Sequence, residues 1–119
     1  IKQRKQFGAY LADMPAIRQI LAEMKMGIVT GRSSYLHAAA LQDQKLPFST
    51  EGASAKIYCT EMANKVCGNA IQLHGGNGYV KEFDVERYYR DARVTTIYEG
   101  TNQIQKVIIS NNEIKGVNF

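Results

Sequence analysis

The sequence of 119 residues carries 15 lysines and arginines against 11 aspartates and glutamates, and 45% of its residues are hydrophobic. These proportions are typical of one ordinary globular domain, and they exclude disordered, collagen-like and disulfide-rich chains. The net charge of +4 is modest, and Lys2, Arg4 and Lys5 lie at the very start of the chain, so a general nucleic-acid surface is not indicated. A local anion site near the N-terminus is the better interpretation.

No apolar run is long enough to span a membrane. The two cysteines, Cys59 and Cys67, would lie about 12 Å apart along one helix, too far for a disulfide, so we expect both to be free and buried. The first residues lack the apolar stretch of a signal peptide, but the chain starts at Ile1 without a methionine, so an address could have been removed. The compartment is therefore undetermined.

A first long helix is predicted by apolar residues three or four apart between positions 10 and 41. Pro15 fits only its first turn, so we place the start near Asp13, with Asp13 or Met14 as the cap. Residues 42–49 have a loop composition.

A second helix should begin at Ser49 or Thr50, with Glu51 in its first turn. It should run to the glycines at 75, 76 and 78, which we expect to supply the left-handed conformations that close a helix. A short helix is predicted over 83–93 and an extended connector over 94–98, because β-branched residues resist helix. A last helix should follow, capped by Thr101. No strand pair is predicted, so the class is all-α, an antiparallel up-down bundle.

The glycine-rich turn over residues 72–79 has two interpretations. The plain one is a helix stop. The functional one is a backbone whose amides can approach a phosphate or carbonyl, because the turn holds more glycine than a stop requires. It is not a dinucleotide fingerprint, because no strand precedes it.

Glu99, between Tyr98 and Gly100, is a loop acid or cap in the plain interpretation. The alternative is a general base. Such a carboxylate needs a water-poor pocket, and Ile97 and Tyr98 could supply its walls.

Other candidates are weaker. His37 has no partners at metal-ligand spacing, so we interpret it as structural and expect no metal site. His74 could cap the preceding helix carbonyls. The cysteines lack a neighbouring histidine or basic cluster, and neither a Ser/His/Asp arrangement nor a P-loop is visible.

Four segments in a fixed order resemble the carboxy-terminal helical domain of the flavin-dependent acyl-CoA dehydrogenases of the short-, medium- or short/branched-chain type. They are Gln3-Arg4-Lys5-Gln6-Phe7-Gly8, Gln72-Leu73-His74-Gly75-Gly76-Asn77-Gly78-Tyr79, Arg90-Asp91-Ala92-Arg93 and Ile97-Tyr98-Glu99-Gly100-Thr101-Asn102-Gln103-Ile104-Gln105. The likeness covers essentially the whole chain. It implies an oxidoreductase of fatty acid β-oxidation whose substrate is an acyl-CoA.

The family's catalytic base matches Glu99. In the family this base removes the proton α to the thioester carbonyl while the β-hydride passes to flavin N5, which leaves a trans-2-enoyl-CoA. The carbonyl oxygen is held by the backbone amide of the same glutamate and a flavin ribityl hydroxyl. Gly100 matches a position near the bound thioester, and is implied to contact substrate.

The resemblance also implies FAD as cofactor. Thr101 and Gln103 match contacts to FAD within one subunit. The positions that match contacts from a neighbouring subunit to the same cofactor are Arg4, Phe7, Gln72, Gly75 and Gly76. A homo-oligomer, a tetramer in the full-length form, follows from this sharing, and an electron-transferring flavoprotein is the implied electron acceptor.

Two departures from the family pattern matter. Pro15 stands where many members have a glutamine, so one polar contact to FAD is expected to be missing. The family's chains are longer, with an amino-terminal helical domain and a central β-domain before this one. We therefore expect residues 1–119 to be a single helical domain of a longer flavoenzyme, lacking the first bundle helix.

Such a fragment should be inactive alone, bind FAD weakly or not at all, and self-associate through an exposed apolar groove. Two alternatives stay open: an acyl-CoA oxidase, and a non-catalytic helical module for interaction or oligomerisation. The chain-length preference, the organism and the compartment (mitochondrial matrix in a eukaryote, cytoplasm in a bacterium) are not determined by the sequence.

Overall fold

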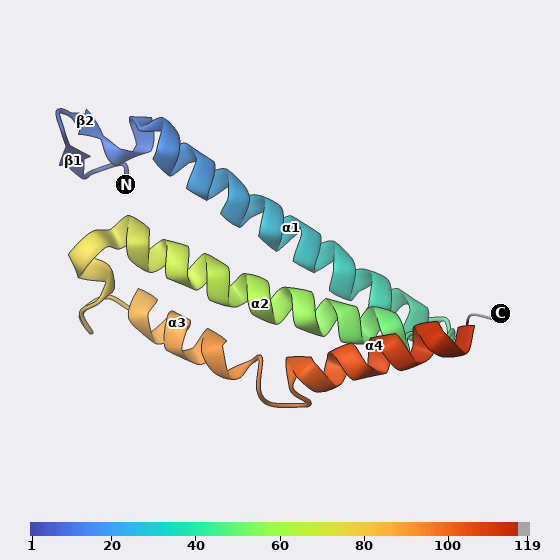
Figure 1. Cartoon of the computed structure of the whole chain (residues 1–119). Helices are drawn as coiled ribbons and strands as arrows, with labels where there is room; N and C mark the ends of the chain where they lie inside the picture. The colour runs from blue at the N-terminus through green and yellow to red at the C-terminus, as the bar shows by residue number, and fades with distance from the viewer. Residues whose placement is uncertain (117–119) are drawn as a thin grey trace.

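A long helical hairpin dominates the structure, a computed structural model that describes residues 1–116. Helix α1 (Pro15–Asp43) runs along the molecule and α2 (Ser49–His74) returns beside it in the opposite direction (Figure 1). The longest dimension is 62 Å and the radius of gyration is 18.3 Å, against about 14 Å for a compact chain of this length. The chain is therefore elongated.

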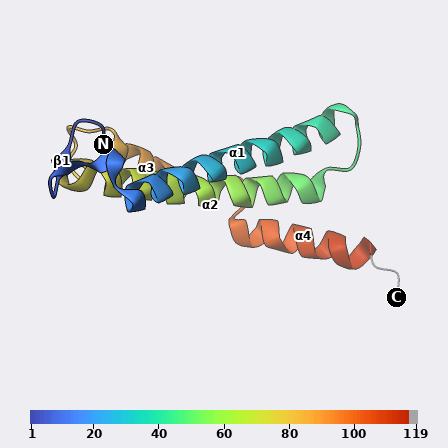
Figure 2. The same cartoon turned by 90° about the horizontal axis from the view of Figure 1, so that it is seen from above.

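Helix α2 is the central element. Helices α3 (Val85–Val94) and α4 (Asn102–Gly116) follow one another along the side of α2 that faces away from α1 (Figure 1). The view from above keeps α4 beside the half of α2 nearest the α1–α2 loop (Figure 2), where Asn112 Nδ2 donates to Ser49 Oγ at 3.2 Å. The predicted all-α, antiparallel up-down class is confirmed.

The prediction that no strands pair is wrong at the N-terminus. Strand β1 (Lys5–Gln6) pairs antiparallel with β2 (Ala9–Tyr10), and the 3-10 turn η1 (Leu11–Asp13) leads into α1. The link is tight because Phe7 and Gly8 both have positive φ, 52° and 80°. Positive φ at both residues is what a type I′ hairpin turn requires.

The predicted helix starts are confirmed where a local signal exists. Met14 caps α1 and Pro15 is its first residue, where a missing amide hydrogen is harmless. Helix α2 begins at Ser49 with Glu51 in its first turn. Thr101 caps α4, since its Oγ1 accepts the amide hydrogen of Ile104 at 3.3 Å.

The glycine turn closes α2 differently from expectation. Of the three glycines only Gly75 has a positive φ, 63°, and the turn continues as the 3-10 segment η2 (Gly75–Gly78). Gly78 is required for space, because an added Cβ would lie 2.5 Å from the carbonyl oxygen of Ile71.

The connector after α3 is a run of turns, so the extended conformation predicted for it is wrong, and α3 itself begins at Val85, two residues later than expected. The threonine hydroxyls explain the turns: Thr95 Oγ1 donates to the carbonyl of Ala92 at 2.6 Å and Thr96 Oγ1 to that of Arg93 at 3.1 Å. These local bonds outweigh the β preference of the residues.

The core of the described chain is small. Its buried apolar residues are four alanines and one leucine: Ala38, Ala53, Ala55, Ala92 and Leu73. Several large apolar side chains of α1 stay exposed, among them Met26, Val29 and Leu36. A groove of about 400 Å³ between α1 and α2 is lined by Gly27, Ile28, Tyr35, Met62, Val66 and Cys67. That this groove is the one expected where a missing helix would pack, and that the chain self-associates through it, both stay predictions.

Both cysteines are free, as predicted, but half-buried where full burial was expected. Burial raises the pKa of the Cys59 and Cys67 thiols. Among the helices of residues 1–116, none has the length and apolar character needed to cross a membrane.

Candidate functional site

Glu99 lies in the loop between α3 and α4, in a conformation that few glutamates adopt. Its φ is 51°, and Gly100 follows with φ 85°. A non-glycine residue in this left-handed region is uncommon. The turn is closed by the amide of Asn102, which donates to the carbonyl of Thr96 at 3.0 Å. An added Cβ on Gly100 would lie 2.7 Å from Gln105 Nε2.

The carboxylate of Glu99 has no bonding partner in the part of the chain that the structure describes. Within residues 1–116 it has no hydrogen-bond partner and no ion-pair partner, and the residue is exposed. Ile97 and Tyr98, which could supply the walls of a pocket, are themselves 53% and 52% exposed and do not enclose the carboxylate in the single chain. Any shield of this carboxylate from water therefore comes from outside these residues.

A polar cleft of about 450 Å³ lies beside this loop. Thr101 and Gln103 line it, together with Asn64 of α2. The Oδ1 atom of Asn64 is buried and has no hydrogen-bond partner within the described chain. Such an acceptor is unusual in a folded protein and suits a hydroxyl or N–H group of a bound molecule.

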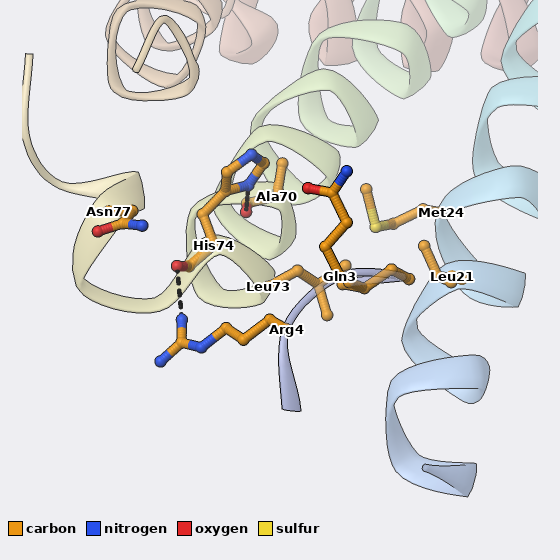
Figure 3. A pocket seen from close by; sticks show the side chains of 9 residues that line it. Gln3, Arg4, Leu21, Met24, Ala70, Leu73, His74 and Asn77 are labelled. Atoms are coloured by element: carbon orange, nitrogen blue, oxygen red, sulfur yellow. Dashed lines mark hydrogen bonds between the residues drawn. The ribbon is translucent and has the colours of Figure 1, made fainter. Parts of the chain in front are cut away.

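A second group of site residues gathers where the N-terminal segment meets the end of α2. Arg4 Nη1 donates to the carbonyl of His74 at 3.0 Å, as the dashed line in Figure 3 marks. An added Cβ on Gly75 would lie 2.5 Å from that nitrogen, so only glycine lets the guanidinium reach the helix end. This cation offsets the negative end of the α2 dipole.

The surroundings of Arg4 are open. Gln72 and Gly76 are exposed, and no atom lies within 4 Å of where a Cβ on Gly76 would be. Phe7, at the tip of the β1–β2 hairpin, is 98% exposed. The adjoining pocket of about 490 Å³ is mostly apolar and includes Leu21, Met24 and Leu73 (Figure 3).

The structure therefore divides the predicted site residues into two groups. Glu99, Gly100, Thr101 and Gln103 belong to the loop and the start of α4. Arg4, Phe7, Gln72, Gly75 and Gly76 belong to the hairpin and the end of α2. Asn102 contacts Thr60 and Arg4 contacts His74, so the contacts lie about 21 Å apart along α2 at the usual helical rise.

Sequence reasoning missed a polar cluster that joins the loop to α2. It consists of Lys56, Thr60, Glu61 and Asn64 of α2 with Asn102 of α4. Asn102 is only 4% exposed. The spacing of four between Lys56, Thr60 and Asn64 places them on one helix face and could have revealed a polar stripe, although not its partner.

In the part of the chain that the structure describes, no three histidine, cysteine, aspartate or glutamate side chains are grouped as a metal site requires. His37 is exposed on α1. The His74 ring nitrogen Nδ1 lies 2.7 Å from the carbonyl oxygen of Ala70. Its predicted role as a cap of helix carbonyls is confirmed.

Comparison with known proteins gives a consistent result. The family described as "Acyl-CoA dehydrogenase, C-terminal domain" matches residues 1–114. The caffeyl-CoA reductase-Etf complex subunit CarC of Acetobacterium woodii is 46% identical over 96% of this chain and 30% of its own. The mitochondrial short-chain specific acyl-CoA dehydrogenase of Bos taurus is 43% identical over 96% and 28%.

The solved structure of butyryl-CoA dehydrogenase from Megasphaera elsdenii superimposes with a TM-score of 0.92 at 39% identity, over 95% of this chain and 30% of that one. The chain thus spans less than a third of the length of the relatives it matches. By this match over nearly all of its residues, the chain belongs to the acyl-CoA dehydrogenase family and corresponds to its C-terminal domain.

Proposed function

We propose that this chain is the C-terminal part of an FAD-dependent acyl-CoA dehydrogenase and that Glu99 is its catalytic base. The observation that carries the proposal is the Glu99–Gly100 turn: a carboxylate without a partner in the described chain, held in a strained loop, in a chain of this family. A structural loop acid does not need the strained backbone.

The chemistry assigned to Glu99 is removal of the proton α to the thioester carbonyl. This proton is weakly acidic, and it becomes easier to remove when the carbonyl oxygen accepts hydrogen bonds. Gly100 leaves the surface beside Glu99 without a side chain, so a thioester can approach the carboxylate. The product is the trans-2-enoyl-CoA.

FAD is the proposed cofactor, and when bound it supplies the acceptor for the β-hydride. The residues present fit a polar, anionic dinucleotide. The buried acceptor Asn64 Oδ1, without a partner in the described chain, lines the same cleft as Thr101 and Gln103. Arg4 offers a cation beside the open backbone of Gly75 and Gly76, which suits a pyrophosphate.

We also propose a homo-oligomer, and the separation of the two groups along α2 supports it. We assign Thr101 and Gln103 to the cofactor of the same subunit. Arg4, Phe7, Gln72, Gly75 and Gly76 are assigned to the cofactor of a neighbouring one. The exposure of Phe7 supports this assignment, because a large aromatic side chain that is 98% exposed has no packing role within its own chain. A tetramer is the proposed assembly of the complete enzyme.

The proposed electron acceptor is an electron-transferring flavoprotein. Support comes from the A. woodii relative, which is named as a subunit of an Etf complex.

The direct test replaces Glu99 by glutamine in the complete enzyme that carries this chain. The amide keeps the size of the side chain but cannot take a proton, so turnover of an acyl-CoA should fall about 10² to 10⁴-fold. Glu113→Gln, an equal change at an exposed position of α4, is the control and should be neutral. The bound flavin should be retained in both. Unchanged turnover in Glu99→Gln would refute the assignment.

A further inference from the structure

The polar cluster on α2 contributes Asn64 Oδ1 to the proposed cofactor cleft, and its other bonds reach both ends of the loop that carries Glu99. Lys56, Thr60 and Asn64 follow one another at intervals of four residues, so their side chains lie on the same helix face. That face meets the end of α3 and the start of α4.

The contact with α4 runs through Asn102, its first residue. The amide oxygen Oδ1 accepts a hydrogen bond from Lys56 Nζ at 2.7 Å. The amide nitrogen Nδ2 donates to Glu61 Oε1 at 2.8 Å and to Thr60 Oγ1 at 3.1 Å. A cation on one side and an anion on the other fix which way the amide points, and bonds to charged groups are stronger than neutral ones.

The contact with α3 runs through Asn64. Its Nδ2 donates to the carbonyl of Ala92 at 3.0 Å, two residues before the end of α3. Ala92 is itself buried, at 8% exposure. Residues 95–101 are thus held to one helix at both of their ends.

The loop needs such anchors because its conformation is unfavourable. Glu99 and Gly100 both have positive φ, and a glutamate left to itself prefers the other regions. Within the described chain, no side chain bonds the carboxylate of Glu99, and Gln105 Nε2 donates only to the backbone carbonyl of Glu99, at 3.4 Å. Its direction is therefore set by the backbone on either side, and on one side that backbone begins at Asn102.

We propose that Asn102, oriented by Lys56 and Glu61, is a positioning residue that fixes the Glu99–Gly100 turn and so aims the base at the substrate. This inference rests on the proposed function of Glu99, but the anchoring of the loop can be measured independently of it.

The pattern of donors and acceptors supplies a sharp set of variants. In Asn102→Asp the oxygen that faces Lys56 is kept, while the donor to Glu61 becomes a second carboxylate beside it, which repels. Adding Glu61→Gln restores the lost bond with its direction reversed, because the glutamine amide can donate to the new aspartate. Asn112→Asp is the matched control, since Asn112 also ties α4 to α2, through Ser49 and Thr50, away from the loop.

The experiment measures two properties of the complete enzyme for each variant. The first is hydrogen exchange of the amides of residues 96–101, which reports the anchoring alone. The second is kcat and KM for an acyl-CoA, with flavin content and melting temperature recorded alongside. Glu99→Gln is measured in the same series. If that variant keeps its activity, Glu99 is not the base, and this result is distinct from a failure of the loop anchor.

For Asn102→Asp we expect faster exchange in the loop and a kcat lower by about tenfold to a hundredfold, the loss a slightly misplaced group causes. KM, flavin content and melting temperature should stay close to those of the parent enzyme. The double variant Asn102→Asp/Glu61→Gln should recover most of the kcat, and Asn112→Asp should alter neither property. Asn64→Asp, which can no longer donate to Ala92, should act in the same direction as Asn102→Asp.

Several results would overturn the proposal. One is an unchanged kcat in Asn102→Asp despite faster loop exchange, and another is unchanged exchange. Equal loss in Asn112→Asp would show that general docking of α4 matters and the loop anchor does not. If Asn102→Asp loses its flavin, the double variant Asn102→Asp/Glu61→Gln decides the matter, and no recovery of kcat in that variant contradicts the inference.

Discussion

The two regions that carry the proposed site are built in opposite ways. The loop around Glu99 is anchored through a buried asparagine and several side-chain hydrogen bonds to α2. The region around Arg4 depends on a two-residue strand pair and one exposed hydrogen bond to His74. In the proposed function the base is positioned by its own chain, whereas the residues assigned to a neighbour's cofactor are presented outward.

The strongest test of this contrast compares the isolated chain with the complete enzyme. We expect the isolated 119 residues to bind FAD at least about a hundredfold more weakly, because a single copy offers only separate parts of the proposed site. A titration followed by flavin fluorescence measures this. Tight, stoichiometric binding by the isolated chain would remove the distinction between the two regions.

Arg4→Gln should affect the cofactor and leave the base in place. Loss of a charge-assisted contact costs about 1.5 to 3 kcal/mol, so FAD should bind about tenfold to a hundredfold more weakly to the complete enzyme. The kcat of enzyme saturated with FAD should change little, which separates this variant from Glu99→Gln. The matched control is Arg87→Gln on α3, which pairs with Asp84 and is not assigned to the cofactor. An Arg4→Gln enzyme with normal FAD affinity would contradict the assignment.

Gly78→Ala should destabilise the turn that positions Gly75. The new Cβ would lie 2.5 Å from the backbone oxygen of Ile71, which cannot move aside, and such overpacking costs about 1 to 3 kcal/mol. Chemical unfolding measures the change in free energy. Gly76→Ala is the control two residues away, where nothing lies within 4 Å and the free energy of unfolding should hardly change; equal effects would contradict the packing argument.

The smallest effect concerns the thiols of α2, between the two regions. Because burial raises the pKa of both Cys59 and Cys67, less reactive thiolate is present at neutral pH than in a free cysteine. Alkylation should therefore be slower than that of a model thiol near pH 7.5, and it should accelerate as the pH rises through the alkaline range. A rate equal to that of the model thiol at all pH values would contradict this.

The sequence predicted well what is decided by neighbouring residues. Pro15 and Ser49 mark helix starts through local rules of the first turn, and Thr101 caps its own helix. Glu99 and the glycine turn could be singled out because they belong to recognisable motifs. The residue types alone did not predict that the group around Glu99 and the group around Arg4 lie apart. The resemblance to the family supplied that division.

Long-range contacts account for most of what was missed. Asn102 and Lys56 are 46 residues apart in the chain, so their bond has no local signal. Thr95 and Thr96 suggested an extended connector because β-branched residues resist helix, and their hydroxyls instead closed turns on Ala92 and Arg93. The hairpin at Phe7 and Gly8 was missed because strands of two residues are too short to show alternation.

The central claim is that Glu99 removes the α-proton, and deuterium exchange tests it most directly. An acyl-CoA analogue with sulfur in place of the β-carbon has no β-hydride to transfer, so proton removal can be followed alone. In D₂O the complete enzyme should incorporate deuterium at the α-carbon, and Glu99→Gln with its flavin retained should not. Exchange at the parent rate in Glu99→Gln would contradict the account.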